Sequence, residues 1–159
     1  MPDREAYAAR QAQLLDSLLR GDDPPPGFVA AHAGAAGSAL RRKRGRAVAR
    51  AWPALAVSLG DGFDVRFDAF ARAGGVDDSG APLRDGLAFA ARLAADGVAL
   101  GDDVQVELLL ARAALRHRSV WVAAARLRDP YSRLLVVARL PFAGLVQRSV
   151  RLRLTGARR

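Results

Sequence analysis

Hydrophobic residues recur every three or four positions from the N-terminus to about residue 118, which is the spacing of amphipathic α-helices. This spacing predicts a first helix over residues 4–20, ended by Gly21, and a second over about 30–52. Further helices are expected in a short piece closed by Gly60, after Asp61, after Pro82 and after Asp102 or Asp103. We therefore expect five or six helices in residues 1–118.

The period changes from 3.6 to 2 at Ser119, where apolar and polar positions begin to alternate. This alternation predicts three strands, at about 120–127, Leu134–Leu140 and Arg148–Thr155. The connections between them are too short for crossovers, so the strands should pair antiparallel. The expected fold class is α+β, with a helical domain over 1–118 and a small three-stranded antiparallel sheet over 119–159.

The second helix carries the most distinctive pattern of charge, and its firm part is expected over 38–51. Five residues should share its apolar face: Leu40, Ala47, Val48, Ala51 and Trp52. Arg42, Arg46 and Arg50 recur at i, i+4 and i+8, which places them on one basic ridge. These three arginines are candidates for contact with a partner protein or nucleic acid, although a charged ridge is also the ordinary solvent face of a helix.

The predicted strands carry a second set of arginines: Arg126, Arg128, Arg139, Arg151 and Arg153. A sheet edge can accept an extended peptide as an additional strand, and arginines nearby would favour an acidic one. We therefore predict these five residues as a candidate peptide-binding surface.

Charge is concentrated in the two regions that hold these arginines. Residues 28–52 carry a net charge of +6 and residues 119–159 a net charge of +8, whereas the rest of the chain sums to −5. Only Lys43 is lysine among the 25 basic residues, which is typical of a GC-rich, actinobacterial coding bias. That bias raises the arginine content of the chain, but it does not explain why acidic residues are nearly absent from these two regions. An acidic partner is therefore expected: nucleic acid, an acidic protein or an acidic peptide.

The sequence contains few candidate catalytic residues. The chain contains no cysteine. The two histidines, His32 and His117, are not spaced from another histidine or an acidic residue in a way that would form a metal site or a catalytic acid–base pair. We predict no catalytic, metal or cofactor-binding residues, no cofactor and no enzyme activity. The chain also lacks a signal-peptide pattern and an apolar run of about 18 residues, so a cytoplasmic protein without membrane contact is expected.

Several short segments together resemble a known family. They are Arg10-Gln11-Ala12-Gln13-Leu14-Leu15, Ala51-Trp52-Pro53-Ala54-Leu55, Leu59-Gly60, Phe63, and then Pro82, Leu83, Gly86, Phe89 and Leu93. In order and spacing they are similar to the helical N-terminal domain, to which DNA binding has been ascribed, of small partner proteins of multinuclear non-haem iron-dependent oxidative enzymes. The strand-rich remainder looks like the shorter C-terminal domain of actinobacterial members.

This resemblance implies a non-catalytic partner subunit. Such a protein would bind a TIM-barrel iron oxidase that modifies ribosomally made precursor peptides, and would help to present the peptide. The iron ligands would belong to the enzyme. The alternative is a DNA-binding or regulatory protein that uses the basic helix 38–51, although the sequence contains no zinc-finger spacing, phosphate loop or interleaving of aromatic and basic residues.

Overall fold

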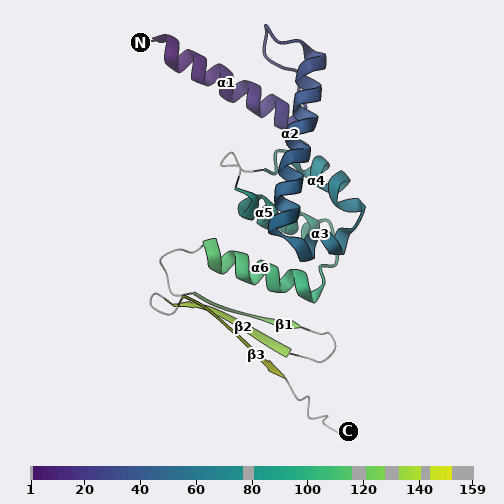
Figure 1. Ribbon diagram of the computed structural model, residues 1–159, viewed down its shortest axis with the longest axis vertical. Helices are drawn as coiled ribbons and strands as arrows, with labels where there is room; N and C mark the ends of the chain where they lie inside the picture. Colours follow the sequence, from purple (N-terminus) through teal and green to yellow (C-terminus); the bar gives the residue numbers. More distant parts are fainter. Residues whose placement is uncertain (1, 77–80, 116–120, 128–132, 141–143, 152–159) are drawn as a thin grey trace. The chain divides into compact units, whose positions relative to one another are not determined.

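The computed structural model describes residues 2–76, 81–115, 121–127, 133–140 and 144–151. The chain forms two compact units, Met1–Arg92 and Leu93–Arg159. The first unit contains α1 (Pro2–Arg20), α2 (Ala30–Ala51), α3 (Pro53–Leu59), α4 (Gly62–Arg72) and most of α5 (Pro82–Ala95) (Figure 1). The second contains α6 (Asp102–Leu115), β1 (Trp121–Leu127), β2 (Arg133–Leu140) and β3 (Gly144–Arg151).

Four phenylalanines form the centre of the first unit. Phe63, Phe67 and Phe70 form a buried stripe on α4 that surrounds Phe89 of α5. The ring of Phe89 lies 5.6, 5.4 and 5.2 Å from the centroids of those three rings. Tilted and edge-on pairs of this kind contribute about 0.5–1.5 kcal/mol each beyond the burial of their area. The cluster therefore joins α4 firmly to α5.

Trp52 stands at the junction of α2 and α3 and is 1% exposed. Pro53 begins α3 at its first turn, where a missing N–H is tolerated. The indole Nε1 of Trp52 donates a hydrogen bond of 3.2 Å to the backbone carbonyl of Pro82, at the start of α5. The ring lies directly on Gly86, where any Cβ atom would overlap it. Trp52 thus sets how closely α5 approaches the end of α2.

In the second unit, α6 lies against β1 and β2. Its buried residues are Val104, Leu108, Leu109, Ala111 and Ala113. The three strands pair antiparallel in the order β1-β2-β3, with Leu127 opposite Arg133 and Leu140 opposite Gly144.

The predicted fold class, α+β with a small sheet as a separate domain, is wrong as stated. The core that the structure describes is helical and is formed by buried hydrophobic side chains of the helices together with Trp52, which lies between α2 and α3. A small β domain with its own core is not shown, because the strands share a compact unit with α6. Short three-stranded sheets need cover on one face, and the alternation in the sequence did not reveal that a helix accompanies them.

The third predicted strand is also displaced. The structure has β3 at Gly144–Arg151 rather than Arg148–Thr155. The pairing of Leu140 with Gly144 starts β3 only a few residues after β2 ends, and this register excludes the later start. The predicted division into 1–118 and 119–159 follows the change in periodicity, whereas the compact units meet between Arg92 and Leu93.

Candidate functional site

The basic residues of α2 fall into two groups that face opposite ways. Arg41 and Arg44 point into the first unit, with 2% and 13% of their side chains exposed. Arg42, Lys43, Arg46 and Arg50 are exposed. The helix therefore uses its arginines both to hold the bundle together and to face solvent.

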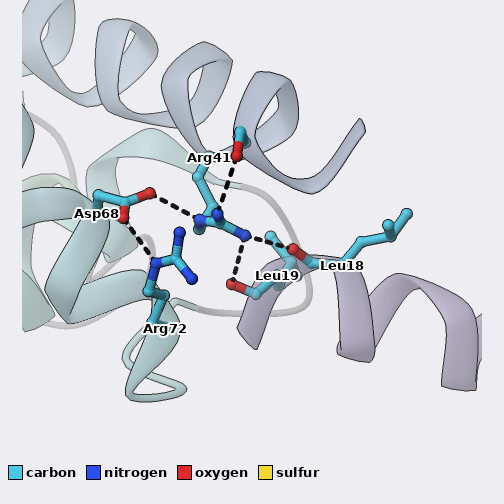
Figure 2. A network of polar contacts seen from close by, with 6 residues as sticks. Leu18, Leu19, Arg41, Asp68 and Arg72 are labelled. Atoms are coloured by element: carbon cyan, nitrogen blue, oxygen red, sulfur yellow. Dashed lines mark hydrogen bonds and ion pairs between the residues drawn. The ribbon is translucent and has the colours of Figure 1, made fainter. Parts of the chain in front are cut away.

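Arg41 is the centre of a buried polar network that joins three helices (Figure 2). Its Nε donates to Oδ1 of Asp68 on α4 at 2.7 Å, and its Nη1 donates to the carbonyl of Leu18 at 2.7 Å, with a longer contact to Leu19. The last carbonyls of a helix have no partner within that helix. Arg41 therefore caps the end of α1 and fastens it to α2 and α4.

Asp68 is shared between two arginines. Nε of Arg72 donates to its second carboxylate oxygen at 2.8 Å, opposite the contact from Arg41. Burial alone would raise the pKa of Asp68, but hydrogen bonds from Arg72 and Arg41 and their positive charges outweigh that effect and lower the pKa. Asp68 therefore stays ionised in the folded protein at neutral pH.

Arg44 forms a second ion pair, with Asp85 of α5, which is 1% exposed. Nη2 of Arg44 lies 2.9 and 2.7 Å from the two carboxylate oxygens, and Nε lies 3.0 Å from Oδ2. This bidentate geometry is the strongest arrangement available to an arginine and a carboxylate. It links α2 to α5 beside Trp52 and Gly86.

The exposed group lines a shallow groove of about 370 Å³ along α2. We call it the basic groove and define it by Ala39, Arg42, Lys43, Arg46 and Arg50. None of its four cations forms an ion pair with a carboxylate in the part of the chain that the structure describes. The sequence around it explains this, because no acidic residue occurs between Asp23 and Asp61. The groove is a concentrated positive surface without an internal counter-charge among described residues.

A second cleft, of about 350 Å³, lies between the end of α1 and the start of α2. Its lining includes Arg41 and Arg72, but both arginines already bind Asp68. This cleft offers no comparable free positive charge, so the basic groove is the stronger candidate site.

A family model described as "SCO6045-like, C-terminal domain" matches residues 8–95, which is more than half of the chain. The chain belongs to this SCO6045-like family. No curated protein and no solved structure gives a significant match. The SCO6045-like domain contains the whole of α2 and the basic groove, together with both buried ion pairs of that helix.

The residues that carry the helical resemblance lie inside the SCO6045-like domain, and several of them belong to its core. Trp52, Pro82 and Gly86 meet one another, and Phe89 lies at the centre of the aromatic cluster. The pattern therefore describes how this helical domain packs. It does not by itself identify what the domain binds.

The structure brings Arg42, Arg46 and Arg50 together on one exposed face of the SCO6045-like domain, with Lys43 beside them. Of the arginines predicted to bind peptide, Arg126, Arg139 and Arg151 belong to β1, β2 and β3, opposite Leu134, Trp121 and Arg133. Their side chains lie outside the described part, and Arg128 and Arg153 lie outside the described residues altogether. Peptide binding by this second set stays a prediction.

Sequence reasoning missed the inward-facing arginines and their partners, Asp68 and Asp85. A signal was present in the helical spacing: Arg41 lies four residues from both Gly37 and Gly45, and Arg44 lies four residues before Val48, which lies four before Trp52. This period was not recognised because two of these positions are glycine and two are arginine. The buried face of α2 therefore does not form an apolar pattern in the sequence.

Neither a candidate metal cluster nor a candidate membrane span occurs in the described ranges. No group of three or more histidine, cysteine, aspartate or glutamate side chains in those ranges is arranged to hold a metal ion. Among the described helices, none combines the length and apolar character needed to cross a membrane.

Proposed function

We propose that the protein is a non-catalytic partner subunit that docks a multinuclear iron-dependent TIM-barrel oxidase and helps to recognise the ribosomally made precursor peptide of that enzyme. The observation that carries the proposal is the basic groove, with four exposed cations and no carboxylate partner among the described residues. Complementary charge across an interface accelerates association and selects the correct partner. A rigid helix that presents such a surface suits docking.

Two further observations support this proposal. Several residues of the resemblance pack within the first unit: Trp52 contacts Pro82 and Gly86, and Phe89 lies in the aromatic cluster. The matched family model is described as a C-terminal domain and covers residues 8–95, and in this chain α6 and the three strands follow the matched residues. A module that works beside another domain fits a partner subunit, whether the enzyme is a separate chain or not.

Coexpression with an iron oxidase encoded by an adjacent gene tests the proposal. We expect the two proteins to copurify and to elute as one complex at micromolar concentration, and we expect turnover of the precursor peptide to increase when this chain is added. An iron oxidase from an unrelated gene cluster serves as the control. Separate elution of the two proteins together with unchanged turnover would sink the proposal.

The alternative, a DNA-binding or regulatory protein, is favoured by one observation. Guanidinium groups also bind phosphates, and Arg42, Arg46 and Arg50 follow one another at about 6 Å along the helix axis. If four cations contact phosphates, the logarithm of the DNA affinity should fall against the logarithm of salt with a slope of about −3.6. A titration with duplex DNA over a range of salt measures that slope, and absence of binding at physiological salt removes the alternative.

A further inference from the structure

The net positive charge of the first unit comes from the basic groove. Residues 1–92 contain thirteen basic and eleven acidic residues, so this unit has a net charge of only +2. Without Arg42, Lys43, Arg46 and Arg50 the balance is nine to eleven, a net charge of −2. The groove is therefore a local positive strip on a unit that is otherwise slightly acidic.

The length of the groove matches a short polypeptide segment. From Ala39 to Arg50 the helix rises by about 16 Å, at about 1.5 Å per residue. An extended chain covers that length with about five residues, and its alternate side chains recur at about 6.6 Å, close to the 6 Å rise between Arg42, Arg46 and Arg50. Carboxylates at every second position of such a segment would meet successive cations.

We infer that the basic groove docks the oxidase through a short acidic segment on the enzyme, with Asp or Glu side chains that bind Arg42, Lys43, Arg46 and Arg50. The inference rests on the proposed function and names the chemistry by which the enzyme is recognised. A segment of about five residues with an acid at every second position carries three carboxylates, which would offset most of the charge of the four cations. A DNA duplex, which carries about one negative charge per 1.7 Å over its whole length, would extend its charge beyond the strip.

Two triple variants distinguish an effect of the groove cations from an effect of the total charge. Arg42→Gln/Arg46→Gln/Arg50→Gln removes three groove cations and keeps a good helix-forming residue at each position. Arg4→Gln/Arg10→Gln/Arg66→Gln removes three exposed arginines outside the groove. Both variants change the net charge of the chain from +9 to +6, so a simple effect of total charge would weaken them equally.

The first measurement uses a labelled short peptide with glutamate at every second position, followed by fluorescence anisotropy. We expect binding to the natural protein, at least about tenfold weaker binding to the groove variant, which loses three charge contacts, and little change in the matched variant. The second measurement is displacement of the oxidase from its complex by the same peptide. Displacement, and loss of the complex in the groove variant alone, are the expected results.

Four outcomes would overturn the inference. They are equal binding of a peptide with glutamine in place of glutamate, equal weakening in both triple variants, tighter binding of duplex DNA that the groove variant abolishes, and displacement of the precursor peptide but not of the oxidase.

The test also separates the two proposals. If the oxidase copurifies but the glutamate peptide neither binds nor displaces it, the inference fails and the proposed function stands. If the peptide binds the groove but no oxidase copurifies, the proposed function fails.

Discussion

At the scale of single residues, Arg44 and Arg42 show how differently two arginines of one helix act. Arg44→Met is expected to lower the free energy of unfolding by about 3 kcal/mol, because the buried carboxylate of Asp85 loses its bidentate partner. Arg42→Met, an exposed change two residues away, should stay within about 0.5 kcal/mol of the natural protein. Urea unfolding of both variants measures the difference, and equal effects would contradict the assignment of Arg44 to the interior.

Asp68 makes stability depend on pH at the acidic end. Its pKa in the folded protein is lowered below the ordinary value of 3.8, so the unfolded chain binds its proton more readily. The stabilisation from Asp68 is therefore complete above about pH 4 to 5 and is lost as the pH falls through the lowered pKa.

Asp68→Asn should lower stability at neutral pH and flatten its dependence on pH in this acidic range. Urea unfolding at several acidic pH values checks this prediction. Asp64→Asn on the same helix removes a carboxylate without removing a contact to Arg41 or Arg72, and provides the control. An unchanged slope in Asp68→Asn would count against the prediction.

At the scale of elements, the glycines of α2 give a sharp test of how α1 is attached. Gly37→Ala would place a Cβ atom 2.6 Å from the carbonyl oxygen of Leu18 and 3.1 Å from Nη1 of Arg41. We expect it to destabilise the protein by about 1–2 kcal/mol, although alanine favours helix. Gly34→Ala, one turn earlier, meets no atom within 4 Å and should stabilise by about 0.5–1 kcal/mol. Thermal or urea unfolding gives both values, and a gain in stability for Gly37→Ala would refute the close contact.

The same helix shows what the sequence could and could not predict. The spacing of Arg42, Arg46 and Arg50 predicts an exposed ridge, and the structure confirms that placement. The predicted apolar face is partly wrong: Val48 and Trp52 are buried, whereas Ala51 is exposed. Residue types alone could not reveal the true buried face. Gly37 is buried against the backbone carbonyl of Leu18, and Arg41 is buried because it donates a hydrogen bond to the same carbonyl. Both contacts exist only once α1 has packed against α2.

At the scale of the whole molecule, periodicity identified the elements better than their grouping. The aromatic stripe of α4 and the change from helix to strand follow directly from the spacing of side chains. The grouping of α6 with the strands depends on which surfaces cover one another, and no local pattern encodes that. For the same reason the partners of Arg44 and Arg41, which lie 41 and 27 residues away along the chain, could not be predicted from spacing.

The basic groove should weaken the fold that carries it, because its four cations have no carboxylate partner among the described residues. Arg42 and Arg46, Arg46 and Arg50, and Lys43 and Arg46 are like charges within one turn, and each such pair destabilises a helix by about 0.2–0.5 kcal/mol. The Arg42→Gln/Arg46→Gln/Arg50→Gln variant should therefore be more stable than the natural protein by about 0.5–1 kcal/mol at low salt. Salt screens this repulsion, so the gain should shrink as ionic strength rises.

Urea unfolding at low and high salt measures that gain, and Arg20→Gln provides the opposite control, since it breaks the exposed ion pair with Asp16 and should cost a few tenths of a kcal/mol. If the triple variant is instead less stable at low salt, the groove cations stabilise the fold and their exposure needs no partner to explain it. If it is more stable, the natural chain retains four repelling cations at the expense of its own stability. A surface that weakens the isolated protein is then most simply explained by the acidic partner that neutralises it.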